Sequence, residues 1–134
     1  MTKSYITQLV FDIMSLAIEV HRHLGPGLLE SVYHKCLKHE LVLNGFKVNS
    51  NMNVPVYYKG LELNTDFRLD LMVNQLVIIE IKSVEHILPV HSAQVLTYMK
   101  LLNKPKGILI NFNSDQLIKG TKHLVNEIFR HLPD

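Results

Sequence analysis

The stretch from Leu76 to Lys82 constrains the fold of this chain more than any other. Its first four residues are apolar, which is typical of a strand that is covered on both faces and lies inside a sheet. Glu80 and Lys82 follow two positions apart, so both side chains project from one face at the strand end. Burying an unpaired carboxylate or ammonium would be costly. The strand end therefore either reaches solvent or carries a polar site.

The rest of the pattern predicts helices packed on a mixed sheet. Helical periodicity covers residues 4–24, 28–44, 91–102 and 120–131, and strand-like segments cover 46–49, 54–58, 63–73, 76–82 and 106–112. The helix over 91–102 joins two buried strands, which predicts that these strands run parallel through a right-handed crossover. The expected fold class is α/β, with helices flanking a central mixed sheet.

Composition limits the class of protein. A length of 134 residues suits one domain over residues 1–134. The 14 Lys and Arg against 12 Asp and Glu give a net charge of +2, which argues against nucleic-acid binding through bulk charge alone. A single cysteine, Cys36, excludes an internal disulfide and an all-thiolate zinc site. Because no apolar run approaches the roughly 18 residues of a membrane span and no signal peptide is visible, we expect a cytoplasmic domain.

The strand before the turn carries Asp70. A two-residue loop would pair Val73 with Leu76 and would direct Asp70 away from Glu80. A three-residue loop or a bulge shifts the pairing by one residue and brings Asp70, Glu80 and Lys82 onto one face. The sequence leaves both registers open, and only the second can form a polar site.

In that second register the side chains suit a hard divalent cation. The carboxylates of Asp70 and Glu80, with the backbone carbonyl of Ile81, would supply the oxygen ligands that Mg²⁺ and Mn²⁺ prefer. Such an ion lowers the pKa of a bound water and polarises a phosphoryl oxygen. The Lys82 ammonium would orient that water or neutralise charge that develops in the transition state. The pattern therefore favours hydrolysis at phosphorus.

Helical segments add polar residues that have both structural and functional interpretations. Gln94 and Tyr98 lie one turn apart on the third predicted helix, with His91 on the same face. This face is either an ordinary helix edge or part of the site, and His91 is placed to contact a substrate phosphate. Glu30 lies in the first turn of the second helix, where an acid complements the helix dipole.

The remaining basic residues give weaker signals. Lys100, Lys104 and Lys106 cluster at the end of the third predicted helix and after it, and they form either a solvated helix end or an edge that binds phosphate. His34 and His39 are five residues apart on the second helix, which is poor spacing for a shared metal site.

Taken together, these residues resemble the PD-(D/E)xK nuclease superfamily. Asp70 is separated by nine residues from Glu80-Ile81-Lys82, and residues 94–98, Gln-Val-Leu-Thr-Tyr, resemble the Gln-x-x-x-Tyr motif of its exonuclease-like branch. Residues 27–33, Gly-Leu-Leu-Glu-Ser-Val-Tyr, resemble the signature of the small GxxExxY proteins. One departure is Leu69, which stands where the superfamily name has proline.

The resemblance implies a restriction-endonuclease-like αβββαβ core and a nuclease that depends on Mg²⁺ or Mn²⁺. It implies a nucleic-acid substrate, with DNA expected before RNA. The site residues that it implies are Asp70 and Glu80 as metal ligands, Lys82 as the catalytic lysine, Glu30 as an acid near the metal or linked to it through water, and Gln94 and Tyr98 as contacts to the phosphate or braces of the site.

Two other interpretations stay open. A domain of this fold that binds nucleic acid or a protein partner without catalysis would fit the low net charge, although the intact set of Asp70, Glu80 and Lys82 argues against it. A site for a small phosphorylated molecule would need a nucleotide pocket, and no phosphate-loop motif is present. A homodimer would enlarge the small binding surface of a chain of this length.

Overall fold

The computed structural model describes all 134 residues. The core is a five-stranded sheet in the order β1-β4-β5-β6-β7, and β2 and β3 form a separate two-stranded sheet. The helices are α1 (Lys3–Leu24), α2 (Glu30–Leu43), α3 (Pro89–Leu102), the 3₁₀ helix η1 (Leu117–Gly120) and α4 (Glu127–Arg130). The strands are β1 (Val48–Asn53), β2 (Val56–Tyr58), β3 (Leu61–Leu63), β4 (Arg68–Val73), β5 (Val77–Lys82), β6 (Lys106–Asn111) and β7 (Thr121–Val125).

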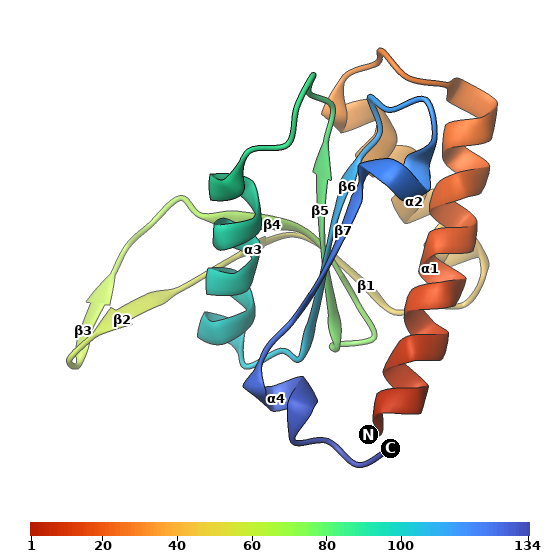
Figure 1. Cartoon of the computed structure of the whole chain (residues 1–134). Coiled ribbons are helices and arrows are strands. Elements are labelled where there is room, and N and C mark those ends of the chain that lie inside the picture. The colour runs from red at the N-terminus through yellow and green to blue at the C-terminus, as the bar shows by residue number, and fades with distance from the viewer.

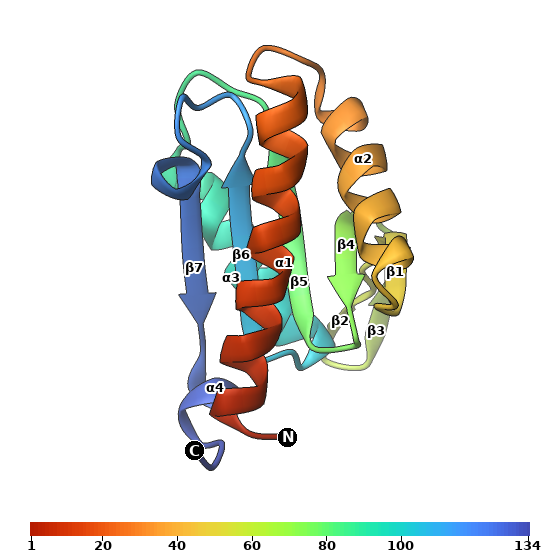
Figure 2. The same cartoon turned by 90° about the vertical axis from the view of Figure 1, so that its right-hand side faces the viewer.

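Helices cover both faces of the central sheet. α1 and α2 lie on one face and α3 lies on the other (Figure 1, Figure 2). A hydrophobic core lies on each face of the sheet, and successive side chains of β5 point into one core and then the other. Ile79 packs on the side of α1 and α2, and Ile78 packs on the side of α3. This arrangement confirms the predicted fold class and the central position of the strand. No helix combines the length and the apolar character needed to cross a bilayer.

The strands β5 and β6 run parallel and are joined through α3, as the sequence predicts. Lys82 at the end of β5 lies beside Asn111 at the end of β6. The helix approaches β6 closely at Gly107, where an added Cβ would lie 2.6 Å from Val95 Cγ1 and 2.7 Å from Met99 Sδ. The ends of β5 and β6 and the start of α3 therefore meet at the end of the molecule opposite the two chain termini (Figure 1).

The helix predicted over 120–131 is wrong. Residues 121–125 form the edge strand β7, which pairs antiparallel with β6 from Thr121 to Val125. Thr121 and Val125 are β-branched, and pairing with the open edge of β6 decides the conformation of a segment whose helical period is weak. Only α4 is helical, and it begins where the Asn126 side chain accepts a hydrogen bond from the Phe129 N–H.

An arm formed by β2 and β3 projects beyond α3 (Figure 1). The turn at Lys59-Gly60 joins the two strands, with positive φ at both residues, and Tyr58 pairs with Leu61. The strand predicted over 63–73 is thus divided, since β3 ends at Leu63 and β4 begins at Arg68. A two-stranded hairpin has little stability of its own. Residues 64–67 have neither helix nor strand structure and connect the arm to the central sheet.

Lys106 is a buried cation at the end of the sheet near the termini. It is 8% exposed and lines a pocket of about 290 Å³ with Ile6, Val10, His123 and other residues. Burial lowers the pKa of its ammonium group. Holding a charge among apolar side chains costs free energy in the folded state.

We expect Lys106→Met to raise the melting temperature at pH 7 by about 2–5 °C. The pKa of Lys106 is lowered in the fold, so the folded protein loses this proton first as the pH rises. The advantage of Lys106→Met should therefore shrink as the pH approaches 10.5, the ordinary value. Thermal melts at pH 7 and pH 10 measure this difference. A lower melting temperature for Lys106→Met at pH 7 would contradict it.

Candidate active site

The hairpin between β4 and β5 has the register that a polar site requires. Val73 pairs with Val77 and Leu71 pairs with Ile79, so residues 74–76 form a three-residue loop. The next pair in this register is Asp70 with Glu80. Asn74 and Gln75 both have positive φ, at 51° and 58°, and this tight turn places Leu76 in the loop instead of in the strand. The three-residue loop thus rules out the register that would separate Asp70 from Glu80.

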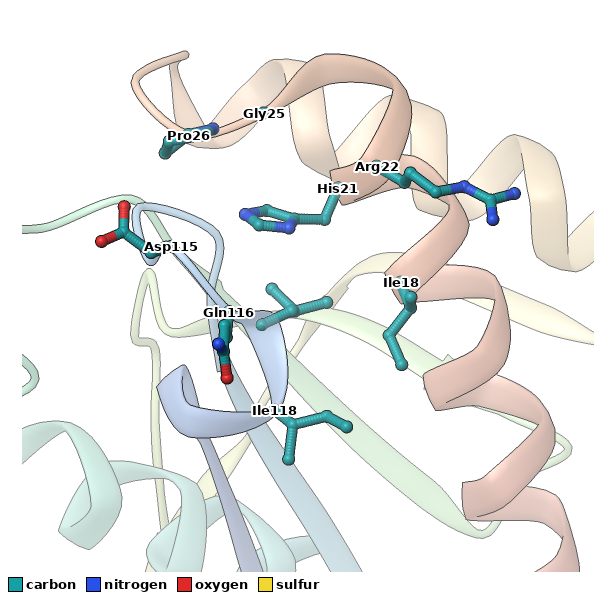
Figure 3. A pocket seen from close by; sticks show the side chains of 9 residues that line it. Ile18, His21, Arg22, Gly25, Pro26, Asp115, Gln116 and Ile118 are labelled. Atoms are coloured by element: carbon teal, nitrogen blue, oxygen red, sulfur yellow. The ribbon is translucent and has the colours of Figure 1, made fainter.

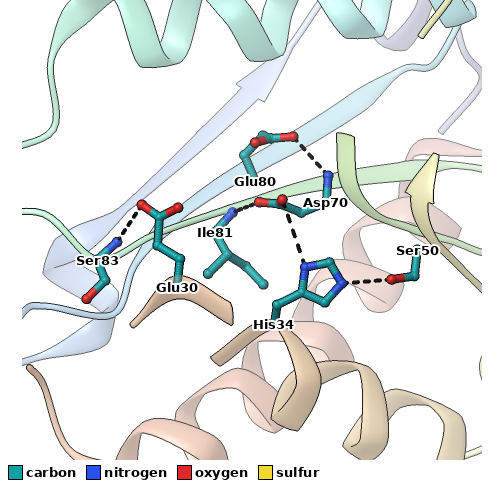
Figure 4. Close-up of polar contacts among 7 residues, drawn as sticks. All are labelled: Glu30, His34, Ser50, Asp70, Glu80, Ile81 and Ser83. Carbon is teal, nitrogen blue, oxygen red and sulfur yellow. Dashed lines mark hydrogen bonds and ion pairs between the residues drawn. The ribbon is translucent and has the colours of Figure 1, made fainter. Parts of the chain in front are cut away.

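The two strands separate at Asp70 and Glu80, and the carboxylates occupy the gap. The Asp70 N–H donates to Glu80 Oε1 at 3.1 Å, and the Ile81 N–H donates to Asp70 Oδ2 at 2.7 Å (Figure 4). A strand residue presents its N–H and C=O to the same neighbouring strand. The Ile81 carbonyl therefore faces the gap as well, whereas the Lys82 carbonyl faces β6 and accepts from the Phe112 N–H at 2.9 Å.

The electrostatics of the pair favour a proton or a cation. Glu80 is 5% exposed. Burial and the negative charge of Asp70 raise the pKa of Glu80 to about 8, although Lys82 opposes the shift. Two carboxylates this close cannot both ionise cheaply in a buried place. A bound cation would remove that penalty.

Lys82 lies on the face of Glu80, and the loop after it is fixed by Asn111. The Asn111 side chain accepts from the Val84 N–H at 3.1 Å and donates to the Val84 carbonyl at 2.9 Å. Asn111 is 4% exposed and comes from β6, the neighbouring strand. Its amide therefore holds the backbone directly after Lys82. The sequence shows this residue only as the end of a buried strand, so this positioning contact was not predicted.

Glu30 reaches the same end of the sheet from the start of α2. Its Oε1 accepts from the Ser83 N–H at 3.3 Å, and Ser83 Oγ donates to the Leu28 carbonyl at 2.5 Å (Figure 4). The loop before α2 is held by Tyr33, whose hydroxyl donates to the Gly25 carbonyl at 2.5 Å and accepts from the Leu28 N–H at 3.1 Å. The spacing of Glu30 and Tyr33 therefore has a structural reason: Tyr33 fixes the loop that presents Glu30.

His34 is a site neighbour that sequence reasoning did not identify. Its Nδ1 lies 3.9 Å from Asp70 Oδ1, and its Nε2 is 2.7 Å from Ser50 Oγ on β1 (Figure 4). Burial lowers the pKa of His34, while the Asp70 charge acts in the opposite sense. The spacing between His34 and His39 does not indicate the role of His34, because its neighbour in the fold is Asp70, on a strand far away in the sequence. The only indication in the sequence is that His34 lies one helical turn after Glu30 and therefore on the same face of α2.

The predicted residues of α3 are divided between the site and its surroundings. Tyr98 is 4% exposed, and burial followed by the charges of Glu80 and Asp70 raises the pKa of its hydroxyl, while a hydrogen bond with Gln94 lowers it. Tyr98 packs in one buried cluster with Ile78, which lies on the same face of β5 as Glu80, and Gln94 lies one helical turn before Tyr98. His91 instead uses its Nδ1 to accept from the Leu88 N–H at 3.0 Å, at the first turn of the helix.

The predicted lysine edge lies elsewhere. Lys106 begins β6 beside Val77, whereas the carboxylates lie near the other end of β5. Lys100 and Lys104 belong to the last turn of α3 and the loop after it, close to Lys106 in the chain and away from the start of α3. The structure does not bring these three lysines to the carboxylate pair.

The carboxylate pair does not line the pocket shown in Figure 3. That pocket has a volume of about 540 Å³ and is formed by α1, the loop after it, and residues 115–118 (Figure 3). It contains one carboxylate, Asp115, and its His21 is already bonded to the Ser114 carbonyl at 2.7 Å. The carboxylate pair therefore lies outside this pocket.

The donor set fits a hard divalent cation that keeps water ligands. Nowhere in the chain do three His, Cys, Asp or Glu side chains gather as a metal site. Glu30 therefore does not join Asp70 and Glu80 in a three-carboxylate set. Two carboxylates and the Ile81 carbonyl are oxygen donors, and Mg²⁺ commonly binds through one or two carboxylates plus several waters. Zinc, which prefers a closed set of nitrogen and sulfur ligands, does not fit.

Comparison with known proteins identifies the family. A sequence model described as the PD-(D/E)XK nuclease superfamily matches residues 7–124. The matched range contains Glu30, Asp70, Glu80, Lys82 and Tyr98. No curated protein and no solved structure matches the chain significantly.

Proposed function

The chain belongs to the PD-(D/E)XK nuclease superfamily, and we propose that it hydrolyses nucleic-acid phosphodiester bonds at the end of β4 and β5. The observation that carries the proposal is the separation of these strands at Asp70 and Glu80. There two carboxylates and the Ile81 carbonyl converge beside Lys82.

In this proposal Asp70, Glu80 and the Ile81 carbonyl hold Mg²⁺ or Mn²⁺. When bound, the ion supplies an activated water and neutralises phosphate charge. Lys82 orients the attacking water and neutralises charge as it develops on the phosphate oxygens. Asn111 keeps the loop after Lys82 in place, which lowers the cost of bringing the ammonium to the reacting group.

The residues around this centre have supporting roles. Tyr98 and Gln94 donate hydrogen bonds to the phosphate or brace Glu80. Glu30 acts through a water, because its carboxylate is already held by the Ser83 N–H. His34 positions Asp70 from the side of α2. Within the superfamily we assign the chain to the GxxExxY group on residues 27–33, with DNA as the preferred substrate.

The test is cleavage by the purified chain. We expect Mg²⁺ or Mn²⁺ to permit cleavage of labelled DNA and chelation to stop it. Single-stranded, duplex and branched substrates should be assayed separately, because the family match does not specify the form of the substrate. Absence of cleavage on all three forms with both metals would contradict the proposal.

A non-catalytic binding role is the second candidate. It is favoured by the net charge of +2 and by the lack of a three-side-chain metal cluster. Calorimetric titration of Mn²⁺ distinguishes the two. The nuclease proposal requires binding by the wild type that is lost in Asp70→Ala, whereas a wild type that does not bind Mn²⁺ supports the binding module.

A further inference from the structure

An exposed aromatic ring lies beside the carboxylate site. Phe67 immediately precedes β4 and is 48% exposed. Its ring centroid is 6.5 Å from that of Tyr98, at an interplanar angle of 48°. Tyr98 in turn packs in one buried cluster with Ile78, which lies on the same face of β5 as Glu80. One buried ring therefore separates an exposed ring from the proposed reacting centre.

Two further exposed rings lie on the arm, where Tyr57 and Tyr58 are neighbours in β2 and project from its opposite faces. Tyr57 and Tyr58 are each 61% exposed, and the Lys59 ammonium lies 5.4 Å from the Tyr58 ring centroid. The backbone connects this arm to Phe67, because the Val54 N–H donates to the Phe67 carbonyl at 2.8 Å. Phe67, Tyr57 and Tyr58 are called here the aromatic path. The two tyrosines belong to β2 of the arm, which projects beyond α3 (Figure 1).

The charges along the path balance. Lys59 and Arg68 are opposed by Glu62 and Asp66. This surface therefore does not attract the phosphate backbone by net charge, and the whole chain carries only +2. Binding must come from the rings themselves, with Lys59 available for one phosphate at the tip.

Exposed rings recognise unpaired bases. Aromatic side chains stack on the face of any base, but in a duplex both faces of an internal base are covered by its neighbours. We propose that the aromatic path stacks on unpaired bases, so that the nucleic acid presented to Asp70 and Glu80 is single-stranded. This inference rests on the proposed nuclease function and specifies its substrate.

The test measures binding without cleavage. Lys82→Ala protein with Ca²⁺ is titrated into a fluorescent 12-nucleotide single strand, a duplex of the same sequence, and an abasic strand of the same length. We expect the single strand to bind most tightly. Adding Phe67→Ala should weaken single-strand binding about tenfold, in the range for loss of one stacked base. Phe67→Trp should restore it, and binding to the abasic strand should not change.

Two further variants provide controls. Phe11 on α1 is 67% exposed and distant from the path, so Phe11→Ala should not alter binding. The double variant Tyr57→Ala, Tyr58→Ala tests the arm independently of Phe67, and it should weaken single-strand binding severalfold. Circular dichroism confirms that each variant is folded.

Several outcomes would overturn the inference. Equal affinity for duplex and single strand would do so, as would an equal loss in Phe67→Ala and Phe11→Ala. Leu61 and Leu63 on the arm are also exposed, so a dimer that becomes a monomer in the tyrosine double variant would show that a second copy covers the path. Because no cleavage is measured, these results are independent of the nuclease test. Cleavage with aromatic-independent binding would remove this inference alone.

Discussion

Lys82→Met is expected to lower the rate of nucleic-acid cleavage by about 10²–10³-fold and to leave Mn²⁺ binding within a few-fold of the wild type. Methionine keeps the apolar part of the half-buried side chain and the backbone bond from Phe112 to the Lys82 carbonyl. Only the ammonium is lost. Since Lys82 is not a proposed ligand, the cleavage step should be slowed while the metal site still binds Mn²⁺.

The measurement combines cleavage rates at saturating metal with calorimetric titration of Mn²⁺. Asp70→Asn is the complementary variant, and it should lose both binding and cleavage because it removes a ligand charge. Lys119→Met, which changes an exposed lysine on η1, is the matched control and should cleave at the wild-type rate. If Lys82→Met also cleaves at the wild-type rate, the catalytic role assigned to Lys82 is wrong.

The sequence predicted the elements that carry the site better than the contacts between them. The apolar run before Glu80 indicated a central strand, because only a strand covered on both faces has that pattern. The hairpin register could not be read in the same way. It depends on Asn74 and Gln75 both taking positive φ, and on the Asn74 side chain accepting from the Lys47 N–H at 2.9 Å across the turn.

Contacts between distant segments could not be predicted from spacing. His34 lies near Asp70, and Asn111 holds Val84, only because α2, β4, β5 and β6 converge at one end of the sheet. For Lys106 the sequence suggested a contact that the fold does not make. This residue is near α3 in the chain and was therefore considered as part of a phosphate-binding edge. The length of β6 separates it from the carboxylates, since six residues of strand span about 20 Å. Nearness in the chain was therefore a poor guide to nearness in the fold here, because α3 returns the chain to the opposite end of the sheet before β6 begins.

The second large effect is on stability, and it needs no substrate. The pKa of Glu80 is about 8 in the fold against 4.5 ordinarily. Between these values the folded protein retains a proton that the unfolded chain has released. The free energy of unfolding of the metal-free wild type should therefore fall as the pH rises from about 5 to 8.

Glu80→Gln should remove this dependence. A glutamine oxygen can still accept from the Asp70 N–H, and its amide has no proton to lose near neutral pH. At pH 8 we expect Glu80→Gln to be more stable than the metal-free wild type by roughly 2–4 kcal/mol, or about 5–15 °C in melting temperature. At pH 5 the difference should largely vanish, because both side chains are then neutral.

Metal addition should reverse the order of stability at pH 8. Mg²⁺ or Mn²⁺ binds the folded wild type and raises its melting temperature, but Glu80→Gln lacks a ligand charge and should not respond. The control is Glu85→Gln, because the Glu85 side chain is 90% exposed and should show neither effect. A wild-type melting temperature that stays constant from pH 5 to 8 without metal would contradict the buried proton. Equal responses of wild type and Glu80→Gln to Mn²⁺ would contradict the assignment of Glu80 as a ligand, because the cation must replace that proton for the strand end to become a metal site.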